Sequence, residues 1–236
     1  MTQFNQALSY DDVLVVPQYS DIESRSEVSL VSELDKDNRF ELPIIASPMD
    51  TVVETEMALA LAELGALGVI HRYNSIRDQR EMVWNVANAA PNKPVAAAIP
   101  ITGDFMERAE ALYNAGATIL CVDVAHGHHI MMKDALRRLR RNLPDNVHIM
   151  AGNVATRKGY EDLADWGAHS VRIGIGGGSI CSTRVQTGHG VPTFQSVLDC
   201  SESEYAGTIP IIADGGIKTS GDIVKSLGAG ADFVMI

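Results

Sequence analysis

Short apolar runs alternate with amphipathic stretches from about residue 43 to the end of the sequence. The apolar runs predict strands over 43–48, 67–70, 94–98, 118–123, 147–151, 170–173, 209–213 and 231–236. The stretches between them carry apolar residues at helical spacing, and they predict helices near 54–64, 75–89, 103–115, 129–142, 156–166, 193–205 and 219–228. Residues 1–43 lack this rhythm.

Apolar strands separated by helices indicate an α/β protein with a parallel sheet covered on both faces. Eight such units close into a (β/α)8 TIM barrel, whose active site lies in the loops after the strands. A doubly wound open sheet is the alternative fold. The barrel is favoured because polar and glycine residues follow the predicted strands, at Ser47, His71, Asp123, Asn153, Gly174 and Asp214.

The sequence stops inside the predicted eighth strand. We therefore expect residues 1–236 to form a single catalytic barrel domain that is incomplete at its C-terminus. In this fold the loop after the eighth strand often completes a phosphate site.

Composition narrows the functional classes. The 236 residues carry a net charge of −11, which argues against nucleic-acid binding because phosphates would be repelled. Three cysteines without a pairing pattern fit a reducing compartment. No apolar run approaches the roughly 20 residues that span a bilayer, and the N-terminus does not resemble a signal peptide. We expect a cytoplasmic protein without a nucleic-acid or membrane partner.

The stretch 174–184 is the richest in chemistry. It follows a predicted strand and holds four glycines together with Ser179, Cys181 and Thr183. Glycines let backbone amides approach an anion closely, and the Ser179 hydroxyl could add a hydrogen bond to a phosphate. Cys181 is a possible nucleophile, although a cysteine can equally serve as a small apolar residue.

Further candidates follow other strands. Asp214-Gly215-Gly216 precedes a predicted helix, which suits a phosphate and a ribose hydroxyl, or simply a tight turn. Asn153 ends a strand as a ligand or a turn former. The cluster His126, His128 and His129 suggests a metal, but no partner set with ligand spacing exists elsewhere, so a loop role near Asp123 is preferred.

Together these residues resemble the family of IMP dehydrogenases and GMP reductases. The resemblance runs from Leu8-Ser-Tyr-Asp-Asp-Val-Leu through Ser47-Pro-Met-Asp-Thr-Val, Ile70-His-Arg and Ala151-Gly-Asn-Val to Ala213-Asp-Gly-Gly-Ile. Its most specific part is the loop Gly-x-Gly-x-Gly-Ser-x-Cys-x-Thr at 174–183.

The resemblance implies a mechanism in which Cys181 attacks C2 of the purine and forms a covalent thioimidate, while hydride passes to or from NAD or NADP. It also implies Thr183 in the water or ammonia step, and Ser47 and Met49 at the purine pocket. Ser179, Gly215 and Gly216 would hold the 5′-phosphate and Asp214 the ribose. Asp123, Asn153, Arg172 and Gly174 would serve the cofactor side. Backbone carbonyls of Gly176, Gly178 and Cys181 would bind a monovalent cation, potassium, and the family implies a homotetramer.

The resemblance leaves the family member open. No CBS modules are inserted after the second predicted strand, which favours a GMP reductase, whereas Ser47-Pro48-Met49 resembles the dehydrogenase form and decides for IMP dehydrogenase. Gly177 and the pair Thr193-Phe194 depart from both patterns. Two other classes remain: a truncated barrel that binds nucleotide without turnover, and an unrelated phosphate-binding barrel such as an isomerase or aldolase.

Overall fold

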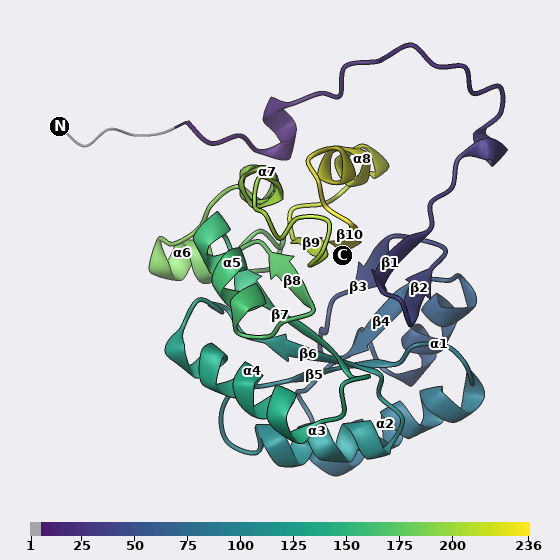
Figure 1. Ribbon diagram of the computed structural model, residues 1–236, viewed down its shortest axis with the longest axis vertical. Coiled ribbons are helices and arrows are strands. Elements are labelled where there is room, and N and C mark those ends of the chain that lie inside the picture. The colour runs from purple at the N-terminus through teal and green to yellow at the C-terminus, as the bar shows by residue number, and fades with distance from the viewer. Residues whose placement is uncertain (1–5) are drawn as a thin grey trace.

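Eight parallel strands form a closed barrel in the computed structural model, which describes residues 6–236 (Figure 1). The strands in barrel order are β3 (Ile44–Ala46), β4 (Leu67–Ile70), β5 (Ala96–Ile99), β6 (Ile119–Asp123), β7 (His148–Val154), β8 (Ser170–Ile173), β9 (Ile211–Asp214) and β10 (Phe233–Met235). The last strand pairs with the first through Val234 and Ile44. The predicted barrel is therefore confirmed, and the open sheet is excluded.

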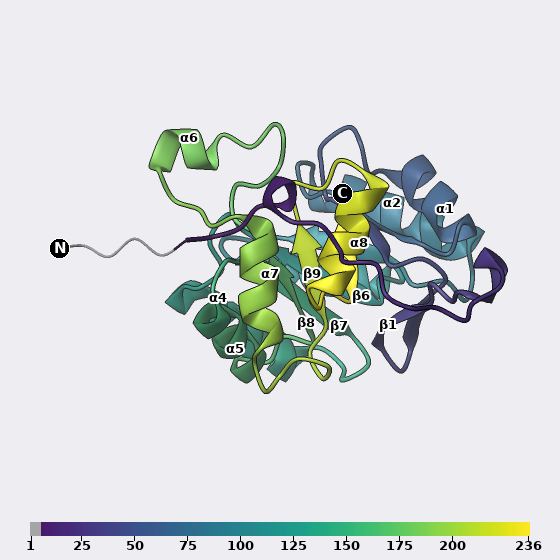
Figure 2. The ribbon, with the colours of Figure 1, turned by 90° about the horizontal axis from the view of Figure 1, so that it is seen from above.

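Helices surround the barrel on the outside (Figure 2). They are α1 (Thr55–Glu63), α2 (Ile76–Ala89), α3 (Phe105–Asn114), α4 (Ile130–Asn142), α5 (Arg157–Asp165), α6 (Thr183–Thr187), α7 (Thr193–Ser201) and α8 (Ser220–Gly228). In α4 the buried residues Met132, Ala135, Leu136 and Leu139 recur at helical spacing, so one stripe of the helix faces the strands. Seven of these helices were predicted, and α6 was missed. None of the helices described between residues 6 and 236 is long and apolar enough to cross a membrane.

A short antiparallel hairpin was also missed. Strands β1 (Ser32–Asp35) and β2 (Asn38–Phe40) pair before the barrel begins. Leu34 and Phe40 are buried in the same apolar cluster as the inward-facing side chains of the barrel strands. The rings of Phe40 and Phe233 pack in a T-shaped arrangement, with their centroids 5.7 Å apart. The hairpin thus contributes apolar side chains to the barrel interior.

The hairpin is tied to the barrel by a buried histidine at the start of β7. Nδ1 of His148 lies 2.5 Å from Oδ2 of Asp35, and its Nε2 lies 2.8 Å from the Ser170 hydroxyl on β8. Burial alone would raise the pKa of the Asp35 carboxyl, but hydrogen bonds from His148 and Asn38 outweigh that effect and lower it. The carboxylate therefore stabilises the docked hairpin in its charged form.

We expect Asp35→Asn to lower the free energy of unfolding by about 1–2 kcal/mol at pH 7, as a charge-assisted hydrogen bond to a half-buried group is weakened. Because the folded pKa of Asp35 is depressed, its contribution is complete above the unfolded pKa of about 4 and is lost as the pH falls below it. Urea unfolding at pH 7 and pH 3 measures this difference. The matched control is Asp37→Asn in the same exposed turn, and an equal loss in both variants would contradict the assignment.

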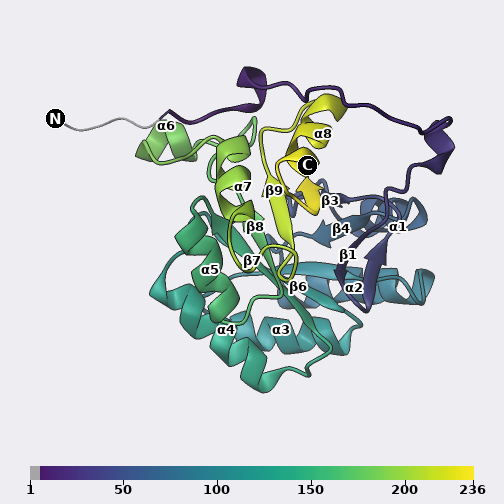
Figure 3. The same ribbon diagram turned by 45° about the horizontal axis from the view of Figure 1, so that its top comes forward.

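Residues 6–31 run along the outside of the molecule, past α7 and α8, before they reach β1 (Figure 3). They contain only two short 3-10 helices, η1 (Tyr10–Asp12) and η2 (Arg25–Glu27). Leu8 exchanges hydrogen bonds with Gln195 on α7, and the Tyr10 hydroxyl bonds to Ser226 on α8 at 2.8 Å. Beyond η1 the segment exposes many apolar side chains, among them Leu14, which is 86% exposed, and Tyr19, which is 94% exposed.

Candidate active site

A cavity of about 400 Å³ lies where the barrel strands end. Twelve of the predicted site residues line it: Ser47, Met49, Asp123, Asn153, Arg172, Gly174, Gly176, Gly178, Cys181, Thr183, Asp214 and Gly215. They come from the ends of β3, β6, β7, β8 and β9 and from the loop after β8. The chain reaches this arrangement because a closed parallel barrel brings the carboxyl ends of all its strands to one face.

Cys181 and Thr183 lie together at this cavity. The Cys181 Sγ is exposed and lies 3.3 Å from the Thr183 hydroxyl, which is on the first residue of α6. Hydrogen bonds from the Thr183 hydroxyl and backbone amide lower the pKa of the Cys181 thiol, and the nearby charge of Arg184 adds to the effect. Burial instead raises the pKa of the two other thiols, to about 11 for Cys121 and about 12 for Cys200. The thiolate of Cys181 is the available nucleophile.

A buried guanidinium joins the two predicted ribose ligands. Arg172 is 5% exposed, and it donates to Oδ1 of Asp123 at 2.7 Å and to Oδ2 of Asp214 at 2.8 Å. Although burial would raise the pKa of the Asp123 carboxyl, the charges and hydrogen bonds of Arg172 and Arg72 together outweigh it and lower that pKa. The Asp123 carboxylate thus stays charged at the cavity wall, where it can accept hydrogen bonds from hydroxyl groups.

Asn153 extends this network to the glycine-rich loop. Its Nδ2 donates to Oδ2 of Asp214 and to the carbonyl of Gly174, both at 2.7 Å. Its buried Oδ1 accepts no hydrogen bond within residues 6–236 and is left for a donor from a ligand. At Gly174, which has a φ of +140°, a Cβ atom would lie 2.0 Å from the carbonyl oxygen of Asp214. The two loops approach too closely for any other residue there.

Ser179 and Gly216 do not line the first cavity. They line an adjacent cavity of about 390 Å³, and Gly177 borders both. Sequence reasoning missed several further residues of this second cavity, among them Tyr10, Arg184 and Lys218. Lys218 directly follows the Asp-Gly-Gly-Ile motif and was a signal that could have been read, whereas Tyr10 reaches the cavity only through the contact of η1 with α8.

The two departures from the family pattern are in contact with each other. A Cβ atom on Gly177 would lie 2.7 Å from the Thr193 hydroxyl, whose oxygen is buried and accepts or donates no hydrogen bond within the described residues. Thr193 therefore fills space that a larger residue at position 177 would need. The threonine at position 193 is therefore compatible only with a residue as small as glycine at position 177.

The loop also presents backbone oxygens that suit a monovalent cation. Within residues 6–236 the carbonyls of Gly176 and Cys181 accept no backbone hydrogen bond, while that of Gly178 accepts one from the Cys181 amide. A carbonyl has two lone pairs, so all three oxygens retain capacity for an ion. The donor set fits the predicted potassium site.

Among the described residues 6–236, His126, His128 and His129 do not belong to a group that could hold a metal ion. His128 bonds to Asp162 at 2.8 Å, and the His129 ring caps α4 by accepting from the Met131 amide. A different group, Asp50, Glu54 and His71, is close enough to hold an ion. However, Nδ1 of His71 accepts from the Tyr73 amide, so in the neutral ring Nε2 carries the proton and faces the carboxylates. That tautomer offers no lone pair to a metal.

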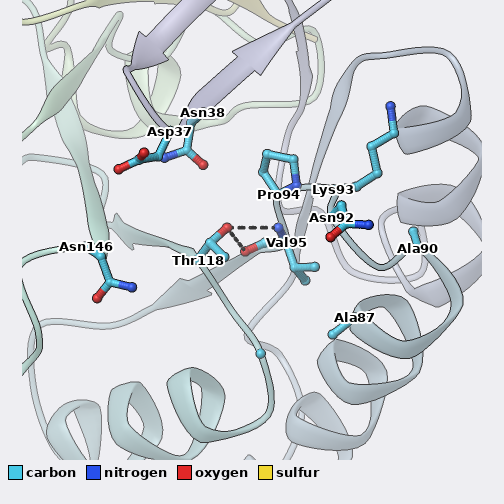
Figure 4. Close-up of a pocket in the computed structure, with 11 residues that line it drawn as sticks. Asp37, Asn38, Ala87, Ala90, Asn92, Lys93, Pro94, Val95, Thr118 and Asn146 are labelled. Atoms are coloured by element: carbon cyan, nitrogen blue, oxygen red, sulfur yellow. Dashed lines mark hydrogen bonds between the residues drawn. The ribbon is translucent and has the colours of Figure 1, made fainter.

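A larger cavity, of about 580 Å³, lies at the opposite end of the barrel (Figure 4). It is bordered by the hairpin turn at Asp37 and Asn38 and by the starts of β5 and β6, where the Thr118 hydroxyl bonds to Val95. Its ionisable lining side chains are Asp37 and Lys93. Because this cavity lacks a nucleophile or a cluster of titratable groups, the cavities at the strand ends are the better candidates for the active site.

Comparison with known proteins agrees with this choice. A family model described as the IMP dehydrogenase / GMP reductase domain matches residues 7–236, which include every predicted site residue. The inosine-5′-monophosphate dehydrogenase of Nitrosopumilus maritimus is 31% identical over 356 residues, covering 99% of this chain and 75% of that protein. The GMP reductase of Vibrio parahaemolyticus is 36% identical over 234 residues, covering 97% of this chain and 67% of that protein. A crystal structure of inosine 5′ monophosphate dehydrogenase from Legionella pneumophila superposes with a TM-score of 0.89 at 45% identity, covering 98% of this chain and 69% of that one.

Proposed function

Because the chain belongs to the IMP dehydrogenase / GMP reductase family of oxidoreductases, we propose that it oxidises IMP at C2, converting IMP, NAD and water to XMP and NADH. The observation that carries this proposal is an exposed thiol of lowered pKa, Cys181, in one cavity with Ser47 and Met49. The Legionella pneumophila dehydrogenase structure, at 45% identity, supports the same direction.

The Cys181 thiolate attacks C2 of the purine, forming an Sγ–C2 bond as the C2–H bond breaks. A bound nicotinamide cofactor supplies the hydride acceptor that no side chain provides. Water then adds to C2 of the thioimidate and the C2–Sγ bond breaks, so that one hydrogen of the water ends on the ring nitrogen and the other on sulfur. Thr183, 3.3 Å from Sγ, lies where it can bond to that water. The covalent intermediate divides the reaction into two steps, each with a lower activation barrier than a single-step reaction would have.

The remaining residues bind and orient. Ser179 and Gly216 hold the 5′-phosphate in the second cavity, while Gly215 and Asp214 line the first cavity, with Asp214 at the ribose. Asp123, Asn153, Arg172 and Gly174 form the wall for the cofactor. The carbonyls of Gly176, Gly178 and Cys181 would hold potassium, whose charge would stabilise the loop that carries the nucleophile.

GMP reductase is the second candidate, in which GMP and NADPH give IMP, NADP and ammonia. It is supported by the match to the Vibrio parahaemolyticus reductase, which is 36% identical over 234 residues. In this chain α2 alone connects β4 to β5. This short connection is the observation that supports the reductase on the side of domain organisation.

An absorbance assay at the wavelength of reduced nicotinamide separates the candidates. We expect NADH to appear with IMP and NAD in the presence of potassium. NADPH consumption with GMP would instead assign the reductase. If neither reaction proceeds but IMP binding is measured by calorimetry, the chain is a nucleotide-binding barrel without turnover. If IMP and GMP both fail to bind, a different phosphate-binding barrel becomes the better explanation.

We further propose a cytoplasmic homotetramer. The three free cysteines support a reducing compartment. The exposed apolar side chains of residues 14–30, led by Leu14 and Val16, support a surface that neighbouring subunits cover.

We expect the double variant Leu14→Asp, Val16→Asp to sediment as a smaller species than the unsubstituted chain, since charges would be buried at the subunit contact. Sedimentation velocity measures this. The control is Val185→Asp, an equally exposed apolar position on α6. An unchanged sedimentation coefficient for the double variant would remove residues 14–30 from the contact.

A further inference from the structure

One arginine side chain spans both ends of the loop that carries the nucleophile. Arg184 is the second residue of α6 and lies three positions after Cys181. Its Nε donates to the carbonyl of Ile175 at 3.0 Å, just after β8, and its Nη2 donates to the carbonyl of Val191 at 2.7 Å, just before α7. The guanidinium therefore joins the outgoing and returning strands of the loop.

Two glycines leave room for this side chain. A Cβ atom on Gly176 would lie 2.6 Å from Cγ of Arg184, and one on Gly190 would lie 2.8 Å from its Nε. Both glycines have positive φ, of +67° and +159°. The arginine stem thus occupies a slot whose walls are the loop backbone itself, although the residue as a whole is exposed.

The slot is coupled to the reacting atoms through α6. Thr183, the first residue of that helix, contacts the Cys181 sulfur, and Gly176 contributes one of the carbonyls assigned to the cation. Because Arg184 is fixed at two points, it restrains the helix that carries Thr183. A shift of this helix would move the Thr183 hydroxyl away from Sγ.

We propose that Arg184 is a positioning residue, whose two-point hydrogen bonding to Ile175 and Val191 holds Cys181 and Thr183 in their reactive arrangement. The proposal rests on the assignment of Cys181 as nucleophile under the proposed function. It assigns the effect to the forked geometry of the guanidinium, and a lysine, with one nitrogen, cannot replace both bonds.

The test compares Arg184→Lys and Arg184→Gln with Arg141→Gln, an exposed arginine on α4. The first readout is the rate of Cys181 alkylation by iodoacetamide at pH 7 on the protein without substrate, with Cys181→Ser giving the background from Cys121 and Cys200. We expect both Arg184 variants to react about fivefold more slowly, since the Thr183 contact is loosened. The Arg141 variant should match the unsubstituted protein.

The second readout is kcat, expected to fall about tenfold in both Arg184 variants. If Arg184→Lys kept the alkylation rate and the kcat of the unsubstituted protein, the proposal would be overturned, because a positive charge at position 184 would then be sufficient without the two hydrogen bonds. A large fall in thermal unfolding temperature in either variant would also overturn it, since Arg184 would then hold the fold. If the unsubstituted protein showed no turnover, the proposed function would be wrong. The alkylation rates would still decide whether Arg184 positions Cys181.

Discussion

Replacement of Cys181 by alanine should reduce turnover of IMP by at least about a thousandfold, because the covalent route depends on its sulfur. Its thiol is exposed and has a lowered pKa, whereas the other two thiols are buried and have raised pKa values. The rate of NADH formation under saturating IMP and NAD measures the effect. Binding of IMP should survive, since the phosphate cavity does not include this side chain.

Cys200→Ala is the matched control for the same chemistry. Cys200 is fully buried on α7, outside both strand-end cavities, and its thiol pKa is raised to about 12. We expect this variant to lose some stability and to keep its turnover. Residual turnover of Cys181→Ala at a tenth of the normal rate would refute the covalent mechanism.

Replacement of Arg172 by methionine should lower the free energy of unfolding by about 3–5 kcal/mol at pH 7. The change removes the guanidinium that lies between Asp123 and Asp214, so Asp214 loses the cation it is paired with and Asp123 keeps only Arg72, whose Nε lies 3.4 Å from its Oδ2. Urea unfolding followed by circular dichroism measures the loss. An exposed change of the same kind, Arg141→Met on α4, should stay within about 0.5 kcal/mol.

The pH dependence of this loss has a definite sign. Arg172 holds the pKa of Asp123 below its usual value, so the pair stabilises the fold above the unfolded pKa of about 4 and ceases to do so at lower pH. The free energies of unfolding of the unsubstituted protein and of Arg172→Met should therefore become more similar as the pH falls below about 4. A difference in these free energies that stays constant down to pH 3 would show that Arg172 acts through packing instead.

The barrel was predictable because each of its strands is a local apolar run, and each strand but the last is followed by a helix-forming stretch. Strand boundaries such as those of β4 and β8 were predicted to the residue. The site followed from the fold, since residues after strands, such as Asp123 and Asp214, must meet at one face of a closed parallel barrel.

The parts that were missed depend on contacts that no local pattern encodes. The hairpin is short and polar in its turn. Its apolar residues Leu34 and Phe40 are buried only because they pack into the barrel interior, which the local sequence does not indicate. The division of the site into two cavities at Gly177 depends on the approach of the β8 and β9 loops. Tyr10 reaches the second cavity through a bond to Ser226, which lies 216 positions away.

The closure of the barrel by β10 against β3 has a consequence for folding during synthesis. β3 cannot find this partner until about 190 further residues have been made, which takes roughly 10–40 s at ordinary elongation rates. Until then β3 presents one unpaired edge, and the apolar interior that the hairpin helps to fill is open to other chains. The protein should therefore depend on chaperones in proportion to translation time, and slow codons between β4 and β9 should increase aggregation of the nascent chain.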